Sequence, residues 1–151
     1  MVRGAALIVQ DGQVALIERR NSERGRHYYL FPGGTMEEGE SPEAAAVREV
    51  EEELGLEIAL GPLVAEVFYG GNSQFYFAAT VLGGRFGCGR GPEMLGQGAP
   101  DAGSYVAIWM PITDLLLHRI YPRAVAEIVV DAATQGWPRD TRRIMDEGDE
   151  Q

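Results

Sequence analysis

Runs of residues in which apolar side chains dominate, or alternate with polar ones, predict most of the strands in this chain. The predicted strands cover residues 3–10, 13–20, 28–31, 57–68, 73–82 and 104–110. Asp11-Gly12 separates the first two runs, and an Asp-Gly pair between apolar runs predicts a β-hairpin. Gly70-Gly71-Asn72 separates the two long runs in the middle of the chain, and it predicts a second hairpin there.

A 3.6-residue period predicts a helix that begins after Ser41. Its apolar stripe consists of Val47, Val50 and Leu54. Ser41 is suited to the N-cap, and Pro42 is suited to the first helical position, where its missing N–H carries no penalty. Gly55 can adopt the left-handed conformation that ends a helix.

The remainder of the pattern predicts the fold class and one domain. Helices are predicted at residues 112–118 and 123–134, with Pro122 between them, and residues 83–101 form a Gly- and Pro-rich loop. We expect a single domain over residues 1–139, followed by a polar tail that frays over residues 140–151. Strands interleaved with few helices predict an α+β fold, with a mixed sheet between helices.

The charge of the chain limits its partners. The formal net charge is −10, and residues 37–57 contain nine Glu against the single cation Arg48. Such a chain is not expected to bind duplex nucleic acid or an anionic membrane, and no apolar run has the length of a membrane span. A small anionic substrate remains compatible, because a bound cation reverses the local charge. The lone Cys88 can form no internal disulfide, which predicts a reducing, cytoplasmic location.

Three carboxylates lie on the helix side that faces away from the apolar stripe. Glu49, Glu52 and Glu53 are spaced i, i+3 and i+4, and their repulsion on an exposed helix costs only a few tenths of a kcal/mol per pair. A solvated acidic face is therefore tolerable, and charge alone does not identify a site. The surrounding spacing does: it reads Gly34, five residues, Glu40, seven residues, then Arg48-Glu49-Val50-x-Glu52-Glu53-x-Gly55-Leu56.

This spacing resembles the Nudix box, G-x5-E-x7-R-E-U-x-E-E-x-G-U, in which U is a bulky apolar residue, and every specified position is met. The resemblance implies the Nudix α/β/α sandwich. It implies that the metal ligands for Mg²⁺ or Mn²⁺ are Glu49, Glu52 and Glu53, completed by a carbonyl of Gly33 or Gly34. It also implies that Arg48 orients the glutamates by ion pairing, and that Glu40 is an outer ligand or a structural anchor.

The implied activity is metal-dependent hydrolysis of a pyrophosphate bond in a nucleoside diphosphate linked to another moiety. The implied catalytic residues are Arg48, Glu52 and Glu53, and the general base is either a box glutamate or Glu93 in the Gly-rich loop. The alternative is a Nudix-fold module that binds a nucleotide or metabolite without cleaving it. The complete set of box carboxylates favours the enzyme, and the family resemblance is compatible with a homodimer.

Residues outside the box are expected to select the substrate. Arg19 and Arg26 are candidates for phosphate contact, and Tyr28 could stack on a base. Nudix enzymes that act on ADP-ribose usually have a Pro where this chain has Gly71. Those that act on dinucleoside polyphosphates usually have a Tyr within residues 72–74, which read Asn-Ser-Gln here. By elimination, a nucleotide or damaged nucleotide is the expected substrate.

Overall fold

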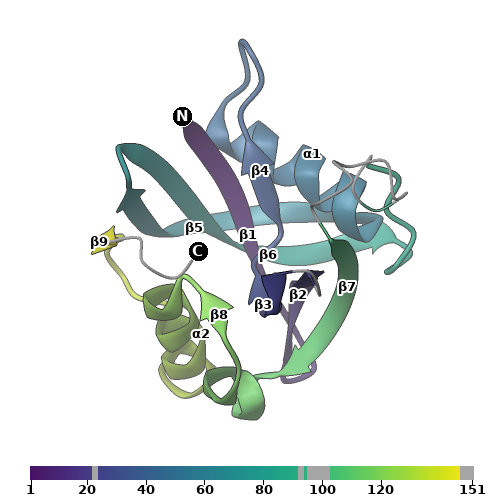
Figure 1. The fold of residues 1–151 in the computed structure, drawn as a ribbon. Helices are drawn as coiled ribbons and strands as arrows, with labels where there is room; N and C mark the ends of the chain where they lie inside the picture. Colours follow the sequence, from purple (N-terminus) through teal and green to yellow (C-terminus); the bar gives the residue numbers. More distant parts are fainter. Residues whose placement is uncertain (22–23, 92–93, 95–102, 147–151) are drawn as a thin grey trace.

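The computed structural model describes residues 1–21, 24–91, 94 and 103–146, and its strands form a curled mixed sheet (Figure 1). The elements are β1 (Val2–Gln10), β2 (Gln13–Asn21), β3 (Arg26–Leu30), β4 (Gly33–Thr35), α1 (Pro42–Leu54), β5 (Leu56–Tyr69), β6 (Asn72–Gly84), β7 (Ser104–Pro111), η2 (Ile112–Leu117), β8 (Ile120–Tyr121), α2 (Arg123–Gln135) and β9 (Arg142–Asp146). The two hairpins and all six strands predicted from the sequence are confirmed.

The sheet has two parts that meet at the β1–β2 turn. Neighbouring strands follow the order β8-β3-β2-β1-β6-β5-β9, while β4 pairs with β1 and β7 pairs with β2. β1 and β2 are paired only next to their turn, where Val9 lies opposite Val14 and Gln10 opposite Gln13. Beyond these residues β1 pairs with β4 and β6, whereas β2 pairs with β3 and β7. The two parts therefore separate as they leave the turn.

The two helices cover different faces of this sheet (Figure 1). Val50 and Leu54 of α1 are fully buried in one core cluster, which also includes Ile8 of β1. Val125 and Val129 of α2 are fully buried in the other cluster. This arrangement confirms the predicted α+β fold with a mixed sheet between helices.

Three short strands and one helix type differ from the prediction. β4 and β8 were not predicted; β4 has three residues and β8 has two. The segment predicted as a helix near residue 112 is the 3₁₀ helix η2. β9 pairs in parallel with β5, from Ala65 opposite Arg142 onward, so the prediction of a fraying tail is wrong for residues 142–146. Backbone pairing with an existing strand edge orders this polar segment.

The helix α1 has the ends that its sequence predicts. The Ser41 Oγ accepts a hydrogen bond from the Ala44 N–H at 3.1 Å, which satisfies one of the unpaired donors of the first turn. Gly55 has φ of 77° and donates its N–H to the Glu51 carbonyl. These two caps define where the first and last turns of α1 begin and end.

The segment that follows β6 covers the C-terminal end of α1. The Gly87 N–H donates to the Leu54 carbonyl at 2.9 Å, and the Gly91 N–H donates to the Glu52 carbonyl at 2.8 Å. Carbonyls in the last turn of a helix have no partner within the helix, so this segment supplies partners that the helix lacks. Part of the Gly-rich stretch predicted as a loop is thus a cap on the carboxylate-bearing helix.

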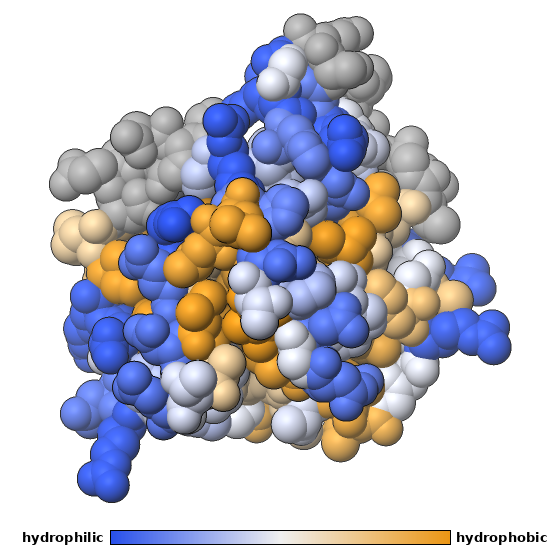
Figure 2. All heavy atoms as spheres, turned by 90° about the horizontal axis from the view of Figure 1, so that it is seen from below, coloured by the Kyte–Doolittle hydropathy of each residue, from blue (hydrophilic) through white to orange (hydrophobic). Residues whose placement is uncertain are grey.

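The surface seen from below in Figure 1 has hydrophobic residues interspersed with hydrophilic ones (Figure 2). Scattered apolar residues of this kind are normal on a folded domain. Among the described residues, no helix combines the length and the apolar character that crossing a membrane requires.

Gly4 lets β1 approach the start of α1 closely, which generates a stability prediction. A Cβ at this position would overlap the carbonyl oxygen of Pro42. Gly4→Ala is expected to lower the free energy of unfolding by about 1–3 kcal/mol, because backbone atoms must move to relieve the overlap. Gly83→Ala is the matched control, since a Cβ at Gly83 meets nothing within 4 Å. Urea unfolding measures both, and equal stability of the two variants would contradict this packing.

Candidate metal and substrate site

The turn between β3 and α1 brings backbone and carboxylates into contact. The Gly33 N–H donates a hydrogen bond of 2.9 Å to the Glu53 Oε1, and Glu53 is 9% exposed. A Cβ on Gly34 would overlap the Glu49 carboxylate. Glycine is therefore required at residue 34 if Glu49 is to lie against this turn. The two carboxylates project from successive turns of α1 toward the same short strand.

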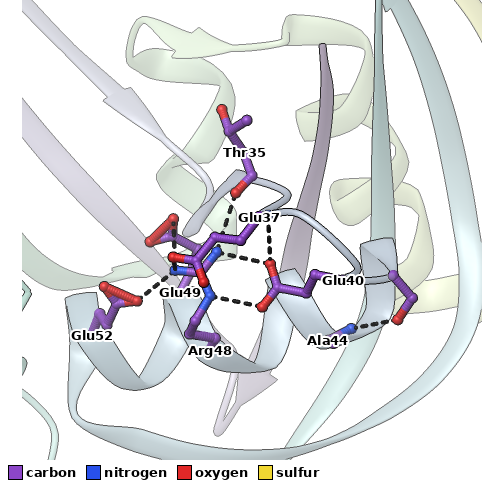
Figure 3. A network of polar contacts seen from close by, with 8 residues as sticks. Thr35, Glu37, Glu40, Ala44, Arg48, Glu49 and Glu52 are labelled. Carbon is purple, nitrogen blue, oxygen red and sulfur yellow. Dashed lines mark hydrogen bonds and ion pairs between the residues drawn. The ribbon is translucent and has the colours of Figure 1, made fainter.

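Arg48 binds the carboxylates that surround it (Figure 3). Its Nε donates to the Glu40 Oε2 at 2.8 Å, and its Nη2 donates to the Glu40 Oε1 at 3.0 Å, a bidentate pair. Its Nη1 donates to the Glu52 Oε2 at 2.6 Å. The Nη2 also donates to the Thr35 carbonyl at 3.1 Å, which joins α1 to the end of β4. One guanidinium thus connects the loop before the helix, the helix itself and the glycine turn.

These contacts change the protonation of the groups involved. Hydrogen bonds from the Arg48 guanidinium, joined by one from the Glu37 N–H, lower the pKa of the Glu40 carboxyl from 4.5 to about 2. The hydrogen bond to Glu40, followed by the one to Glu52, raises the pKa of Arg48 above its usual range. Glu40 and Arg48 are therefore both charged at neutral pH. The Arg48–Glu40 contact matches the predicted role of Glu40 as a structural anchor.

A pocket of about 310 Å³ opens beside the glycine turn. Glu49 and Glu53 line it from α1, and Gly33 and Gly34 line it from β4. Glu52, predicted as a third ligand, is not among its lining residues and lies against Arg48 instead. The structure thus brings together four of the five predicted metal-site residues.

The donor set in this pocket fits a hard divalent cation. Carboxylate and carbonyl oxygens are the groups that Mg²⁺ and Mn²⁺ prefer, and Mg²⁺ keeps several of its waters. Among the described residues, no three His, Cys, Asp or Glu side chains converge into a complete protein cage. Glu49 and Glu53 beside the Gly33–Gly34 backbone therefore suit a partly hydrated ion that completes its shell with water and substrate oxygens.

Arg19 and Tyr105 lie at another part of the pocket, and Tyr28 lies beside Arg19 without lining the pocket. Arg19 is paired with Tyr28 on one side and with Tyr105 on the other, across β3, β2 and β7. The Arg19 Cζ lies 3.6 Å from the Tyr105 ring centroid and 5.8 Å from that of Tyr28. Arg19 and Tyr105 line the pocket. A planar cation stacked on a tyrosine is a surface on which a nucleobase can lie.

The remaining predicted residues lie next to the pocket or outside the described part of the chain. The Arg26 Cζ is 5.4 Å from the Tyr28 ring centroid, and neither of these two residues lines the pocket. Glu93 lies outside the described residues.

Sequence reasoning missed several residues that line the pocket, among them Arg3 and Tyr105. Each is distant from the box along the chain and reaches the pocket through strand pairing. The signal for Tyr105 was only its position in a predicted strand, residues 104–110.

Comparisons with known proteins identify the family of this chain. A model of the NUDIX domain matches residues 1–129. The chain is 32% identical over 129 residues to an 8-oxo-dGTP diphosphatase of Haemophilus influenzae. This alignment covers 80% of this chain and 91% of that protein. It is 41% identical over 61 residues to a CTP pyrophosphohydrolase of Escherichia coli, an alignment that covers 40% of this chain and only 45% of that protein.

Solved structures share the fold. A NUDIX hydrolase from Nitrosomonas europaea superposes with a TM-score of 0.72 at 18% identity, covering 97% of this chain and 78% of that chain. The family match extends over most of the described residues and includes the whole box. The chain therefore belongs to the Nudix hydrolase family.

Proposed function

We propose that this protein is a divalent-metal-dependent pyrophosphohydrolase that acts on a nucleoside diphosphate linked to another moiety. The observation that carries the proposal is the juxtaposition of Glu49, Glu53 and the Gly33–Gly34 backbone in one pocket. The Haemophilus and Escherichia relatives are named as a diphosphatase and a pyrophosphohydrolase, and these names support hydrolysis of a pyrophosphate bond.

Carboxylates of α1 would hold the metal. Glu49 and Glu53 are the proposed direct ligands, and Mg²⁺ or Mn²⁺ bound there would stabilise charge on the phosphates and orient water. The Gly33 N–H fixes the orientation of the Glu53 carboxylate before any ligand arrives. Arg48 holds the carboxylate of Glu52, which does not line the pocket.

The reaction adds the oxygen of one water to a phosphorus atom and breaks the bond to the bridging oxygen. The departing phosphate takes that oxygen with its electron pair, and the general base accepts the water proton. Two carboxylates are candidates for this base, Glu53 in the pocket and Glu93 in the loop before β7. Arg19 and Tyr105 are proposed to bind the nucleoside end, with Tyr28 and Arg26 supporting Arg19 from the neighbouring strand.

A panel of phosphoanhydrides tests the proposal. Nucleoside triphosphates, nucleoside diphosphate sugars, ADP-ribose and dinucleoside polyphosphates are incubated with the protein and Mg²⁺, and the products are separated by ion-exchange chromatography. We expect at least one compound to yield a nucleoside monophosphate, and EDTA to stop the reaction. Tight binding by calorimetry with no product from any compound would support a non-catalytic binding module instead.

The ligand assignment predicts the effect of one neutral substitution. Glu53→Gln keeps an oxygen that can accept from the Gly33 N–H but removes the negative charge. We expect kcat/KM to fall about a hundredfold or more, because several kcal/mol of metal-dependent charge stabilisation are lost. Glu51→Gln is the matched control, since Glu51 is exposed on the same helix and does not line this pocket. Full activity of Glu53→Gln would overturn the assignment.

The Arg48–Glu40 pair predicts how stability depends on pH. The folded-state pKa of Glu40 is about 2 and its ordinary value is 4.5, so the folded state binds the proton less readily than the unfolded state. The resulting stabilisation is complete above pH 4.5 and is lost as the pH falls through about 2. Glu40→Gln should therefore weaken the dependence of the urea midpoint on pH in this window. Identical slopes for Glu40→Gln and the unmodified protein would contradict the bidentate pair.

A further inference from the structure

Residues 85–91 form a capping segment over the end of α1, and this segment holds the helix backbone on both sides of Glu53. The Gly91 N–H donates a hydrogen bond of 2.8 Å to the carbonyl of the residue before Glu53. The Gly87 N–H donates a hydrogen bond of 2.9 Å to the carbonyl of the residue after Glu53. Both acceptors lie in the last turn of the helix, where carbonyls have no partner within the helix. The capping segment therefore fixes the backbone from which the Glu53 side chain projects.

Gly89 lies directly against the peptide group of Glu53. A Cβ added at Gly89 would lie 2.5 Å from the Glu53 carbonyl carbon and 2.5 Å from the carbonyl oxygen. Non-bonded carbon atoms in favourable contact lie about 3.5–4.0 Å apart, so a side chain there would push the capping segment and the helix apart by roughly 1 Å. Gly87 has a φ of 86°, whereas Gly89 has a φ outside the left-handed region. Glycine is therefore required at residue 89 by close contact and not by backbone conformation.

The side chain of Glu53 is held from the opposite direction. Its carboxylate accepts a hydrogen bond of 2.9 Å from the Gly33 N–H, and the residue is 9% exposed. Glu53 is thus held at its carboxylate by the glycine turn and at its backbone by the capping segment. A displacement of the backbone must break the bond to Gly33 or move the carboxylate within the pocket. Metal ligands have to be held within roughly 0.5 Å of their productive geometry, so such a displacement would weaken a metal site.

Phe86 anchors the capping segment on β7. Its ring stacks on that of Trp109, with centroids 4.9 Å apart and an interplanar angle of 28°. Both rings pack against the core cluster that contains Leu54 of α1, and so does Tyr105, which lines the pocket. The capping segment therefore lies between the helix that carries Glu53 and the strand that carries Tyr105.

We propose that Gly89 is a positioning residue for the proposed metal site, because its contact with the Glu53 peptide determines where the Glu53 carboxylate lies in the pocket. This inference rests on the metal-dependent function proposed above. Gly89 does not line the pocket, and it acts only through Glu53. Phe86 supports this contact by holding the capping segment against Trp109.

The affinity for Mn²⁺ tests the positioning role without depending on catalysis. Free Mn²⁺ is measured by electron paramagnetic resonance during titration of the unmodified protein, Glu53→Gln and Gly89→Ala. The difference between the unmodified protein and Glu53→Gln separates binding in the pocket from binding to exposed carboxylates. We expect Gly89→Ala to raise the Kd for the pocket by about tenfold to a hundredfold, the range found when residues that orient metal ligands are changed.

Two control variants separate positioning from a loss of stability. Gly83→Ala makes the same substitution where a Cβ meets nothing within 4 Å, and it should leave the Kd unchanged. Val129→Ala removes buried methyl groups from the core cluster on the other face of the sheet, so it should lower the urea midpoint. Its Kd, measured below the unfolding transition, should also stay unchanged.

Substitutions of Phe86 keep the proposal testable if Gly89→Ala does not fold. Phe86→Leu is apolar but cannot stack on Trp109, so it should raise the Kd for Mn²⁺. Phe86→Tyr keeps the aromatic ring and should retain the affinity of the unmodified protein. Urea unfolding of each variant establishes that it is folded.

The outcomes separate this inference from the function on which it rests. An unchanged Kd in Gly89→Ala and Phe86→Leu, with weaker binding by Glu53→Gln, would overturn the positioning role and leave the metal site in place. Equal increases in Gly89→Ala and Val129→Ala would also overturn it, because lost stability would then account for both. Equal binding by Glu53→Gln and the unmodified protein would overturn the ligand assignment and the positioning role together. Binding that depends on Glu53 and Gly89, without hydrolysis of any phosphoanhydride in the panel, would overturn only the pyrophosphohydrolase.

Discussion

The contact between α1 and the glycine turn is the constraint on which the site depends. A buried carboxylate is costly unless its oxygens are hydrogen-bonded, and the Gly33 N–H supplies such a bond to Glu53. Arg48 adds a second connection, from the helix to Glu40 and to the Thr35 carbonyl. The contacts that hold the helix against the sheet are therefore the same contacts that orient its carboxylates. A change that weakens these contacts would disturb both the fold and the proposed metal site.

Local electrostatics explain how so acidic a protein can bind an anionic substrate. Most of the net charge lies on and around α1, where Arg48 neutralises part of it and a bound cation would neutralise more. Arg19 and Arg3 add two further cations to the lining of the pocket. The metal and these arginines would reverse the charge only where the phosphates lie. A net negative charge elsewhere on the surface does not exclude a small nucleotide from such a site.

Local sequence predicted those parts of the fold that local physics determines. Ser41, Pro42 and Gly55 define α1 because capping acts within a few residues, and Asp11-Gly12 defines a hairpin for the same reason. β4 and β9 could not be predicted, since a three-residue strand and a polar strand exist only through pairing with β1 and β5. The box spacing predicted Glu49, Glu52 and Glu53 as ligands, but it could not show that Glu49 and Glu53 line the pocket whereas Glu52 lies against Arg48. Arg3 and Tyr105 reach the pocket through register between distant strands, which no local pattern encodes.

Anomalous diffraction from a crystal of this protein soaked in Mn²⁺ tests the central claim most directly. The claim is that a divalent cation binds between the pocket carboxylates of α1 and the glycine turn. It predicts an anomalous peak within coordination distance of Glu49 and Glu53, beside the Gly33–Gly34 backbone. A peak confined to the exposed acidic surface around Glu51 and Glu57, or no peak at a Mn²⁺ concentration that supports hydrolysis, would contradict the account.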